Sequence, residues 1–594
     1  MHPVIQRLKE RKLIQWALAY GAGAWLVLQI LDVTAEPWGL SGGVIRTAQA
    51  SLAVGFIITL VLAWYHGERG RQRVSGPELL IIAGILVISG LLAPRLGSDE
   101  PAAEEQLGEV AESAGTPDGS MRPSIAILPF ANMSGDEGDS YFTDGIHEEI
   151  LTRLGQLEGL RVISRTSVLK YGTDPPNIRE IAQELGVGYV GEGSVRRAQD
   201  RVVITFQLID ASLDEHLWAE SYERVLEPAQ IFDVQRDVAQ RIAASLETRL
   251  TPEEEARIAS VPTEDLEAYD LYLRGREGIQ AGTIEGFNMA IDYFDQAIGR
   301  DPRYAPAYAG KAFAYANLSN VTLPPLVAMP EAKDAARRAM ELDPDLAEAH
   351  TWMGFAHIHF DWDWGAGELE LRKALELNPN STEALWAYAG YLTLRGEFDQ
   401  GLAYLERARE IDPSSFLVES AFMGFQFTYF LARRYEDGIA EGARAREMFP
   451  NTPGPLFGLG IALVGAGRFD DGVRVLEEAL RLDDSPVFQA WFAWALAESG
   501  RESDARALLS KVEEISDRLY MCKYEIAVAH VTLGQADAAF EWLDRAFEDR
   551  AGCLPLLKVD PRLDPIREDP RFAEALNRVG LASPASGGEL RGRP

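Results

Sequence analysis

One spacing constrains this chain more than any other feature: between residues 264 and 550, a short motif recurs about every 34 residues. In most copies an alanine is followed, five residues later, by a proline, as in FDQAIGRDP, LRKALELNP and LERAREIDP. The marking alanines are Ala297, Ala339, Ala374, Ala408, Ala445, Ala479 and Ala546. A period of this length predicts stacked helix pairs, because one pair alone cannot bury its apolar face.

The repeating unit resembles the tetratricopeptide repeat, a helix–turn–helix unit with small and aromatic residues at fixed positions. One copy carries its small, turn, aromatic and helix-ending residues at Ala389, Gly396, Phe398 and Pro413. The resemblance implies seven to eight units over residues 264–550. They would form an all-α superhelix whose concave groove is lined by the first helix of each pair.

The groove is the candidate binding site. In the two clearest units, the side chains expected to face it are Glu383, Trp386, Thr393, Phe457, Ile461 and Val464. A groove of apolar, aromatic and polar side chains suits an extended or helical peptide. The sequence therefore predicts a protein or peptide partner.

No pattern in the sequence indicates catalysis, a cofactor or a metal, and the chain is predicted not to be an enzyme. The segment HIHFDWDW (357–364) offers two His and two Asp as metal ligands. On a helix, however, His357 and His359 point about 200° apart, so we expect packing roles. The acidic residues Asp144, Glu148 and Glu149 are expected to form a solvated first turn of a helix.

Residues 123–250 have a different pattern, which predicts a small α/β domain. Short apolar runs at 124–130 and 160–164 indicate buried strands, and alternating residues from 189 to 223 indicate three more. Apolar residues recur at helical spacing over 139–157 and 229–250, and Asn177 can cap a further short helix.

The segments SIAILPFANMSGD, YFTDGIHEEILTRLGQLEGLRVISRTS and IAQELGVGYVGEGSVRRAQDRVVITFQLIDA, followed by HLWAESYER, resemble the TolB amino-terminal-like domain in their order. The resemblance covers residues 123–250. Proteins of this layout are bacterial inner-membrane proteins that carry tetratricopeptide repeats behind this domain. The resemblance thus implies a multidomain chain of transmembrane helices, a TolB-like α/β domain and a repeat superhelix.

The first 94 residues predict a membrane anchor. Apolar stretches at 13–31, 47–65 and 79–94 have the length and composition of transmembrane helices. Small residues at 21–24 of the first stretch would permit self-association. Residues 95–122, which are acidic and contain no aromatic residue, are expected to form a flexible linker.

Basic residues give the expected orientation. They precede the first stretch and follow the second, whereas the loop between these stretches has only Arg46. The positive-inside rule then places the N-terminus in the cytoplasm. Three crossings would put the body in the periplasm of a bacterial inner-membrane protein; if the third stretch does not cross, the body is cytoplasmic.

The net charge of −34 argues against non-specific binding to nucleic acid, which depends on Lys and Arg. We therefore expect a non-enzymatic, membrane-tethered scaffold or adaptor that serves envelope assembly or signalling. The alternatives are an enzyme or signalling component associated with a nucleotide cyclase, and a membrane-bound transcription regulator.

The end of the chain carries the last expectations. Residues 551–582 should cap the last repeat, and residues 583–594 should form a frayed tail. Cys522 and Cys553 are the only cysteines, and near the starts of successive units they could approach one another. A disulfide needs Cα atoms within about 7 Å, so two separate thiols are the favoured expectation and a disulfide is the alternative.

Overall fold

The computed structural model describes residues 122–134, 140–172, 175–319, 322–415, 419 and 423–582. The predicted transmembrane stretches 13–31, 47–65 and 79–94, the linker up to residue 121 and the tail 583–594 lie outside these residues. Within the part that is described, none of the helices combines the length and the apolar character that crossing a membrane requires. The described residues belong to one compact unit.

The first part of this unit is built on a mixed β-sheet with the strand order β3-β1-β4-β5-β6. Its strands are β1 (Ser124–Ile127), β3 (Arg161–Val162), β4 (Tyr189–Ala198), β5 (Arg201–Asp210) and β6 (Glu215–Val225). A short strand, β2 (Ala131–Asn132), also pairs with β4. β1 runs parallel to β3 and β4, while β4, β5 and β6 are joined as antiparallel neighbours.

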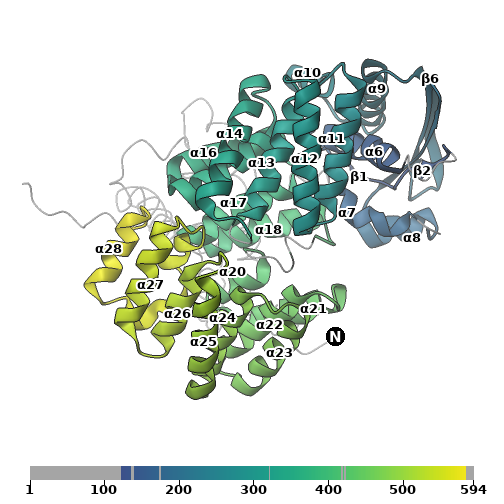
Figure 1. The fold of residues 1–594 in the computed structure, drawn as a ribbon. Coiled ribbons are helices and arrows are strands. Elements are labelled where there is room, and N and C mark those ends of the chain that lie inside the picture. The colour runs from purple at the N-terminus through teal and green to yellow at the C-terminus, as the bar shows by residue number, and fades with distance from the viewer. Residues whose placement is uncertain are drawn as a thin grey trace, which may run out of the picture. The chain divides into compact units, whose positions relative to one another are not determined.

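Helices connect and cover these strands as the sequence predicts. α6 (Ser140–Gly155) follows the first strands, and α9 (Pro228–Ser245) follows β6. Between β3 and β4 lie α7 (Arg165–Val168), η3 (Leu169–Tyr171) and α8 (Ile178–Leu185). The Asn177 side chain caps α8 by accepting a hydrogen bond from the Glu180 amide, and Gly186 ends the helix with φ +62°. Figure 1 shows the sheet with α8 and α9 near it.

The second part contains eight helix pairs among the described residues, preceded by α10 (Pro252–Ile258). The first four pairs are α11 (Leu266–Gln280) with α12 (Ile284–Arg300), α13 (Ala305–Leu318) with α14 (Pro325–Leu342), α15 (Ala347–Ala356) with α16 (Trp364–Leu377), and α17 (Thr382–Arg395) with α18 (Phe398–Ile411). The last four pairs are α20 (Phe425–Leu431) with α21 (Tyr435–Met448), α22 (Pro453–Gly465) with α23 (Phe469–Leu482), α24 (Pro486–Glu498) with α25 (Glu502–Ser516), and α26 (Lys523–Thr532) with α27 (Ala536–Glu548).

The marking alanines explain why these helices pack as a repeat. Each lies near the C-terminal end of the second helix of its pair, and all seven are at most 1% exposed. Only a very small side chain fits where helices cross closely, and the interior of a protein is packed too densely to accept a larger one. Most of these helices end at an Asp or Asn three or four residues later, just before the following turn.

The C-terminal segment is more than a cap on the last pair. It comprises η5 (Leu554–Lys558), η6 (Pro561–Ile566) and α28 (Pro570–Arg578). Lys558 Nζ donates a hydrogen bond to the carbonyl of Arg395 at 2.7 Å, and the Arg433 guanidinium pairs with Asp564 at 2.6 Å. The segment therefore packs back onto the middle of the array.

The segment HIHFDWDW contacts the C-terminal part of the chain. Its backbone forms the π-helical turn η4 (His357–Asp361) before α16. Trp364 Nε1 donates to the carbonyl of Val579 at 2.7 Å, and Trp362 packs against the ring of Phe547. Both tryptophans therefore pack against residues that lie about two hundred positions further along the chain.

Candidate functional site

The α/β domain lies against the repeat array at two separated places. At the first, α6 packs on α11: the Glu148 carboxylate pairs with the Arg276 guanidinium and accepts a 2.9 Å hydrogen bond from Gln280. Nearby, the Tyr141 hydroxyl donates to Asp270 at 2.5 Å. The side chain of Leu273 also lies so close to Gly145 that there is no space for a β-carbon on the glycine. These contacts fix α6 on the first repeat.

The second contact is with the fourth repeat. Asn380 Nδ2 lies 3.0 Å from the carbonyl oxygens of Gly155 and Leu160, at the end of α6 and just before β3. Asp412 is 3% exposed and accepts hydrogen bonds from Thr166 at 2.7 Å and Ser167 at 2.6 Å. The domain thus bridges the first helices of the array from the first repeat to the fourth.

A cavity of about 560 Å³ lies under this bridge. One side is lined by α6 and by residues 162–166, and the other by first helices of four successive repeats, α11, α13, α15 and α17. In a tetratricopeptide array, the first helices line the concave groove. The chain's own α/β domain therefore covers this part of the concave groove, which the sequence predicts as the binding site.

Carboxylates line the cavity from both sides. Glu149 comes from the second half of α6, whereas Glu348 and Glu383 come from the first turns of α15 and α17. Glu149 and Glu348 are half-buried, whereas Glu383 is exposed. Burial raises the pKa of the Glu149 and Glu348 carboxyl groups, although the charge of Arg276 acts in the opposite direction on both. At Glu148 burial opposes ionisation, but the charge of Arg276 outweighs it and lowers the pKa.

The acidic residues of α6 were expected in a solvated first turn, and the structure corrects this. Glu148 and Glu149 lie in the second half of α6, where one is paired and both line the cavity. Asp144 pairs with Arg165 at 3.2 Å. Their positions depend on a repeat helix that lies more than a hundred residues further along the chain, so the local pattern could not show it.

The predicted groove residues of the fourth repeat lie in three different surroundings. Glu383 lines the cavity. Trp386 is half-buried, and its ring stacks on Phe355 with 6.1 Å between ring centroids. Thr393 is fully buried, with its hydroxyl 3.3 Å from that of Thr428. Thr393 is therefore a packing residue, and its place in an accessible groove is corrected.

The other three predicted groove residues come from α22. Ile461 and Val464 are buried in the main apolar core, so neither can contact a partner. Phe457 is half-buried and stacks on Phe488 of α24 at 4.7 Å between ring centroids. Phe488 was missed because its unit matches the repeat pattern less clearly, although Phe457 and Phe488 are 31 residues apart, close to one repeat period.

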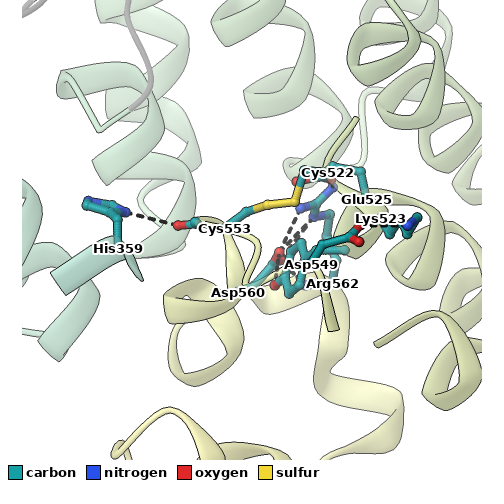
Figure 2. Close-up of a disulfide and its surroundings, with 10 residues drawn as sticks. His359, Cys522, Lys523, Glu525, Asp549, Cys553, Asp560 and Arg562 are labelled. Atoms are coloured by element: carbon teal, nitrogen blue, oxygen red, sulfur yellow. Dashed lines mark hydrogen bonds and ion pairs between the residues drawn. A yellow bond between two sulfur atoms is a disulfide. The ribbon is translucent and has the colours of Figure 1, made fainter. Parts of the chain in front are cut away.

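The C-terminal segment carries an ion cluster onto the first helices of the last two pairs. Arg562 is 5% exposed; it pairs with Asp560 at 2.7 Å and with Glu525 of α26 at 2.8 Å. Its guanidinium carbon lies 3.2 Å from the ring centroid of Trp491 on α24. Figure 2 shows the two carboxylates gathered around this guanidinium. A sequence cannot reveal this cluster, because its members come from three separate elements.

A disulfide joins Cys522, directly before α26, to Cys553, directly before η5. Their Cα atoms are 6.8 Å apart, inside the range that a disulfide spans. The favoured expectation of two separate thiols is therefore wrong, and its alternative holds. The physical reason is that the segment after α27 turns back beside the start of α26 instead of continuing the regular stack.

The histidines of HIHFDWDW lie apart, as their helical spacing indicates. His359, labelled in Figure 2, is buried, and its Nδ1 lies 2.9 Å from the carbonyl of Gly552. Burial lowers the pKa of His359 to about 4. His357 contacts Asp361 at 2.9 Å, and His350 contacts Glu370 at 2.6 Å. No group of three potential metal ligands occurs within the described part of the chain.

The fold thus defines a tetratricopeptide-repeat protein with a small sheet domain packed over part of its groove. Comparison with known families agrees on the repeats: a tetratricopeptide repeat model matches residues 363–416 and 457–518. Residues 121–241, which the sequence analysis likened to TolB, match the second domain of HilA/YgeH-like transcriptional regulators.

Curated proteins are similar to this chain over part of their length. A protein of Rhizobium meliloti (strain 1021) named "Putative adenylate cyclase 3" is 45% identical over 202 residues, which are 34% of this chain and 33% of that protein. The transcriptional regulator HilA of Salmonella typhimurium is 23% identical over 299 residues, 49% of this chain and 51% of that protein. The chain therefore spans about a third of the first relative and about half of the second.

Solved structures resemble the helical part only loosely. Human IFIT1 bound to m7Gppp-AAAA has a TM-score of 0.37 at 15% identity, over 54% of this chain and 81% of that one. Yeast Tom70 has a TM-score of 0.33 at 14% identity, over 59% and 82%. Likenesses of this size carry no argument about a partner.

Proposed function

We propose that this protein is a non-enzymatic scaffold that binds a protein partner through the second half of its repeat array. The observation that carries the proposal is the stacked pair Phe457 and Phe488 on the first helices α22 and α24. Both rings are half-buried. Repeat arrays bind through such first-helix surfaces, and aromatic anchors often supply much of the binding energy.

The first half of the array is less suited to an extended partner. The α/β domain bridges α11 to α17 over the groove, and a peptide there would have to displace Asn380 and Asp412 from their hydrogen bonds. We therefore assign partner binding to the aromatic pair. Of its two residues, Phe457 was predicted from the sequence and Phe488 was not.

We further propose that the scaffold is anchored in a bacterial inner membrane with its folded part in the periplasm. The three apolar stretches and their basic flanks support the anchor. The disulfide supports the compartment, because disulfides persist in oxidising compartments and are rare in the cytosol.

The regulator and cyclase relatives suggest alternatives, since one is a transcriptional regulator and the other is named for a cyclase. The match to the second domain of HilA/YgeH-like regulators, together with the repeats, favours a shared sensing or adaptor part over shared chemistry. A TolB-like role for the sheet domain is a further alternative, and its support is the resemblance of the sequence segments between residues 123 and 250 to the TolB amino-terminal-like domain.

Photo-cross-linking in living cells tests partner binding. A benzophenone amino acid in place of Phe488 should give a discrete cross-linked protein, because that ring lies at the proposed anchor. The same probe in place of Phe469, which is 36% exposed on the second helix α23, is the matched control and should give none. Combining the Phe488 probe with Phe457→Ala should reduce the adduct at least fivefold. Equal adducts from positions 488 and 469 would reject the proposed surface.

A fusion reporter tests the compartment. Alkaline phosphatase, which is active only outside the cytoplasm, should be active when fused after Gly119, while green fluorescent protein at the same position should stay dark. The reason is that three crossings place residue 119 outside. If the phosphatase fusion is inactive and the green fluorescent protein fusion is fluorescent, the folded part of the chain lies in the cytoplasm.

A further inference from the structure

The cavity between the α/β domain and the first helices has the size and lining of a small-molecule site. Its volume, about 560 Å³, lies within the range of ligand pockets. Its walls come from two parts of the chain that hydrogen bonds hold together on both sides, through Glu148 on α6 and Asn380 before α17. A preformed space of this kind reduces the ordering that a ligand must impose.

The charges of the lining are unbalanced. The cavity is lined by seven carboxylates and four guanidinium groups. Glu148 has Arg276 as a partner, and Asp412 is held by two hydroxyl groups. Among the described residues, by contrast, Glu149, Glu348 and Glu383 form no ion pair, and Glu383 accepts only a long 3.4 Å hydrogen bond from Ser381. Three carboxylates of the lining therefore have no ion pair of their own: the charge of Arg276 acts on all three, but its guanidinium is paired with Glu148.

The helix dipole explains only part of this arrangement. It favours a carboxylate in the first turn of α15 and of α17, by at most about 1 kcal/mol at such positions. It does not explain Glu149, which lies beyond the middle of α6 and faces the same cavity. Nor does it explain why Glu149 and Glu348 line the same cavity from opposite parts of the chain.

Two further features of the lining favour a positively charged ligand. The rings of Tyr272, Phe313 and Trp352 line the cavity, and those of Phe313 and Trp352 are packed edge to face at 4.7 Å. Aromatic faces attract ammonium and guanidinium groups. In addition, Gln156 Oε1 is buried in the lining and has no hydrogen-bond donor within the described structure, so an N–H group of a ligand would satisfy it.

We propose that this cavity binds a small organic cation, a molecule with ammonium or guanidinium groups and a short apolar chain. Glu348 and Glu383 bind its positive groups from the repeat side and Glu149 from α6, while the aromatic rings contact its methylene groups. The ligand would then join the α/β domain to the repeats, because both supply its contacts. This inference does not depend on the partner-binding proposal.

Isothermal titration calorimetry tests whether the cavity binds an organic cation. The purified full chain in detergent is titrated with spermidine and with L-arginine at constant ionic strength. We expect at least one probe to bind with a dissociation constant below about 100 µM. Fully acetylated spermidine, which lacks the charges, should bind at least tenfold more weakly. The double variant Glu348→Gln/Glu383→Gln should weaken binding of the charged probe at least tenfold.

The matched control removes the same charge elsewhere. Glu376 and Glu502 are exposed on the second helices α16 and α25, so Glu376→Gln/Glu502→Gln should change the affinity less than twofold. If the first double variant does not fold, Glu149→Gln replaces it, with the same expectation of weaker binding. Absence of binding by both probes, or equal weakening in the test and control variants, would overturn the proposal. Equal weakening would mean that the probes bind only to the general negative charge.

Discussion

Replacing Arg562 by Met is expected to lower the free energy of unfolding of the repeat array by about 3–5 kcal/mol. The guanidinium is buried between Asp560, which is 0% exposed, and Glu525, which is 3% exposed. Removing it leaves two buried carboxylates without a counter-charge, whose desolvation is then uncompensated. Urea unfolding followed by tryptophan fluorescence measures the loss, since Trp491 is in contact with this side chain.

Two variants separate the buried ion cluster from a general effect of losing an arginine. Arg571, in the same C-terminal segment, pairs with Asp569 of that segment and with Asp537 of α27. Its side chain is 46% exposed, so Arg571→Ala should cost less than about 1 kcal/mol. Neutralising both buried acids, in Arg562→Met/Asp560→Asn/Glu525→Gln, should recover more than half of the loss. If Arg562→Met is as stable as Arg571→Ala, the guanidinium does not hold the segment in place.

Breaking the disulfide is expected to have the second-largest effect. In the double variant Cys522→Ala/Cys553→Ala, the free energy of unfolding should fall by about 3–4 kcal/mol. The reason is that the unfolded chain is no longer closed into a loop between two residues 31 positions apart. The Cys522 side chain makes no capping hydrogen bond to α26, so alanine should leave the helix intact. Urea unfolding of the oxidised protein and of the variant gives the difference.

A reductant supplies the control. Dithiothreitol should lower the stability of the natural chain toward that of the double variant and leave the double variant unchanged. Mass spectrometry of unreduced, alkylated protein should find the two cysteine peptides linked. Two alkylated cysteines, with no effect of dithiothreitol, would contradict the disulfide and remove one support for a periplasmic body.

The local pattern predicted most of the secondary structure. The cap at Asn177, the three alternating strands β4 to β6 and the periodic alanines of the second helices all follow from neighbouring residues. These features depend on hydrogen bonds and packing within one or two adjacent elements, which is the range over which periodicity in a sequence is informative.

The candidate sites were predicted less well. Phe457 lies at a half-buried aromatic pair and Glu383 lines the cavity, whereas Thr393, Ile461 and Val464 are buried. The repeat register identifies the helix on which a residue lies. It does not show whether the concave face of that helix is open, because another part of the chain can cover it.

By itself, the sequence determined that this protein is a repeat of helix pairs preceded by a small α/β domain, since a period of about 34 residues and alternating strands leave little choice of fold. The tertiary structure alone decided what covers the groove. The α/β domain spans the first four repeats, and the segment from Cys553 to Val579 returns to α17, α24 and α26. The contacts that hold the α/β domain and the C-terminal segment in place join residues up to about 250 positions apart. A local sequence pattern does not show which distant surfaces are complementary.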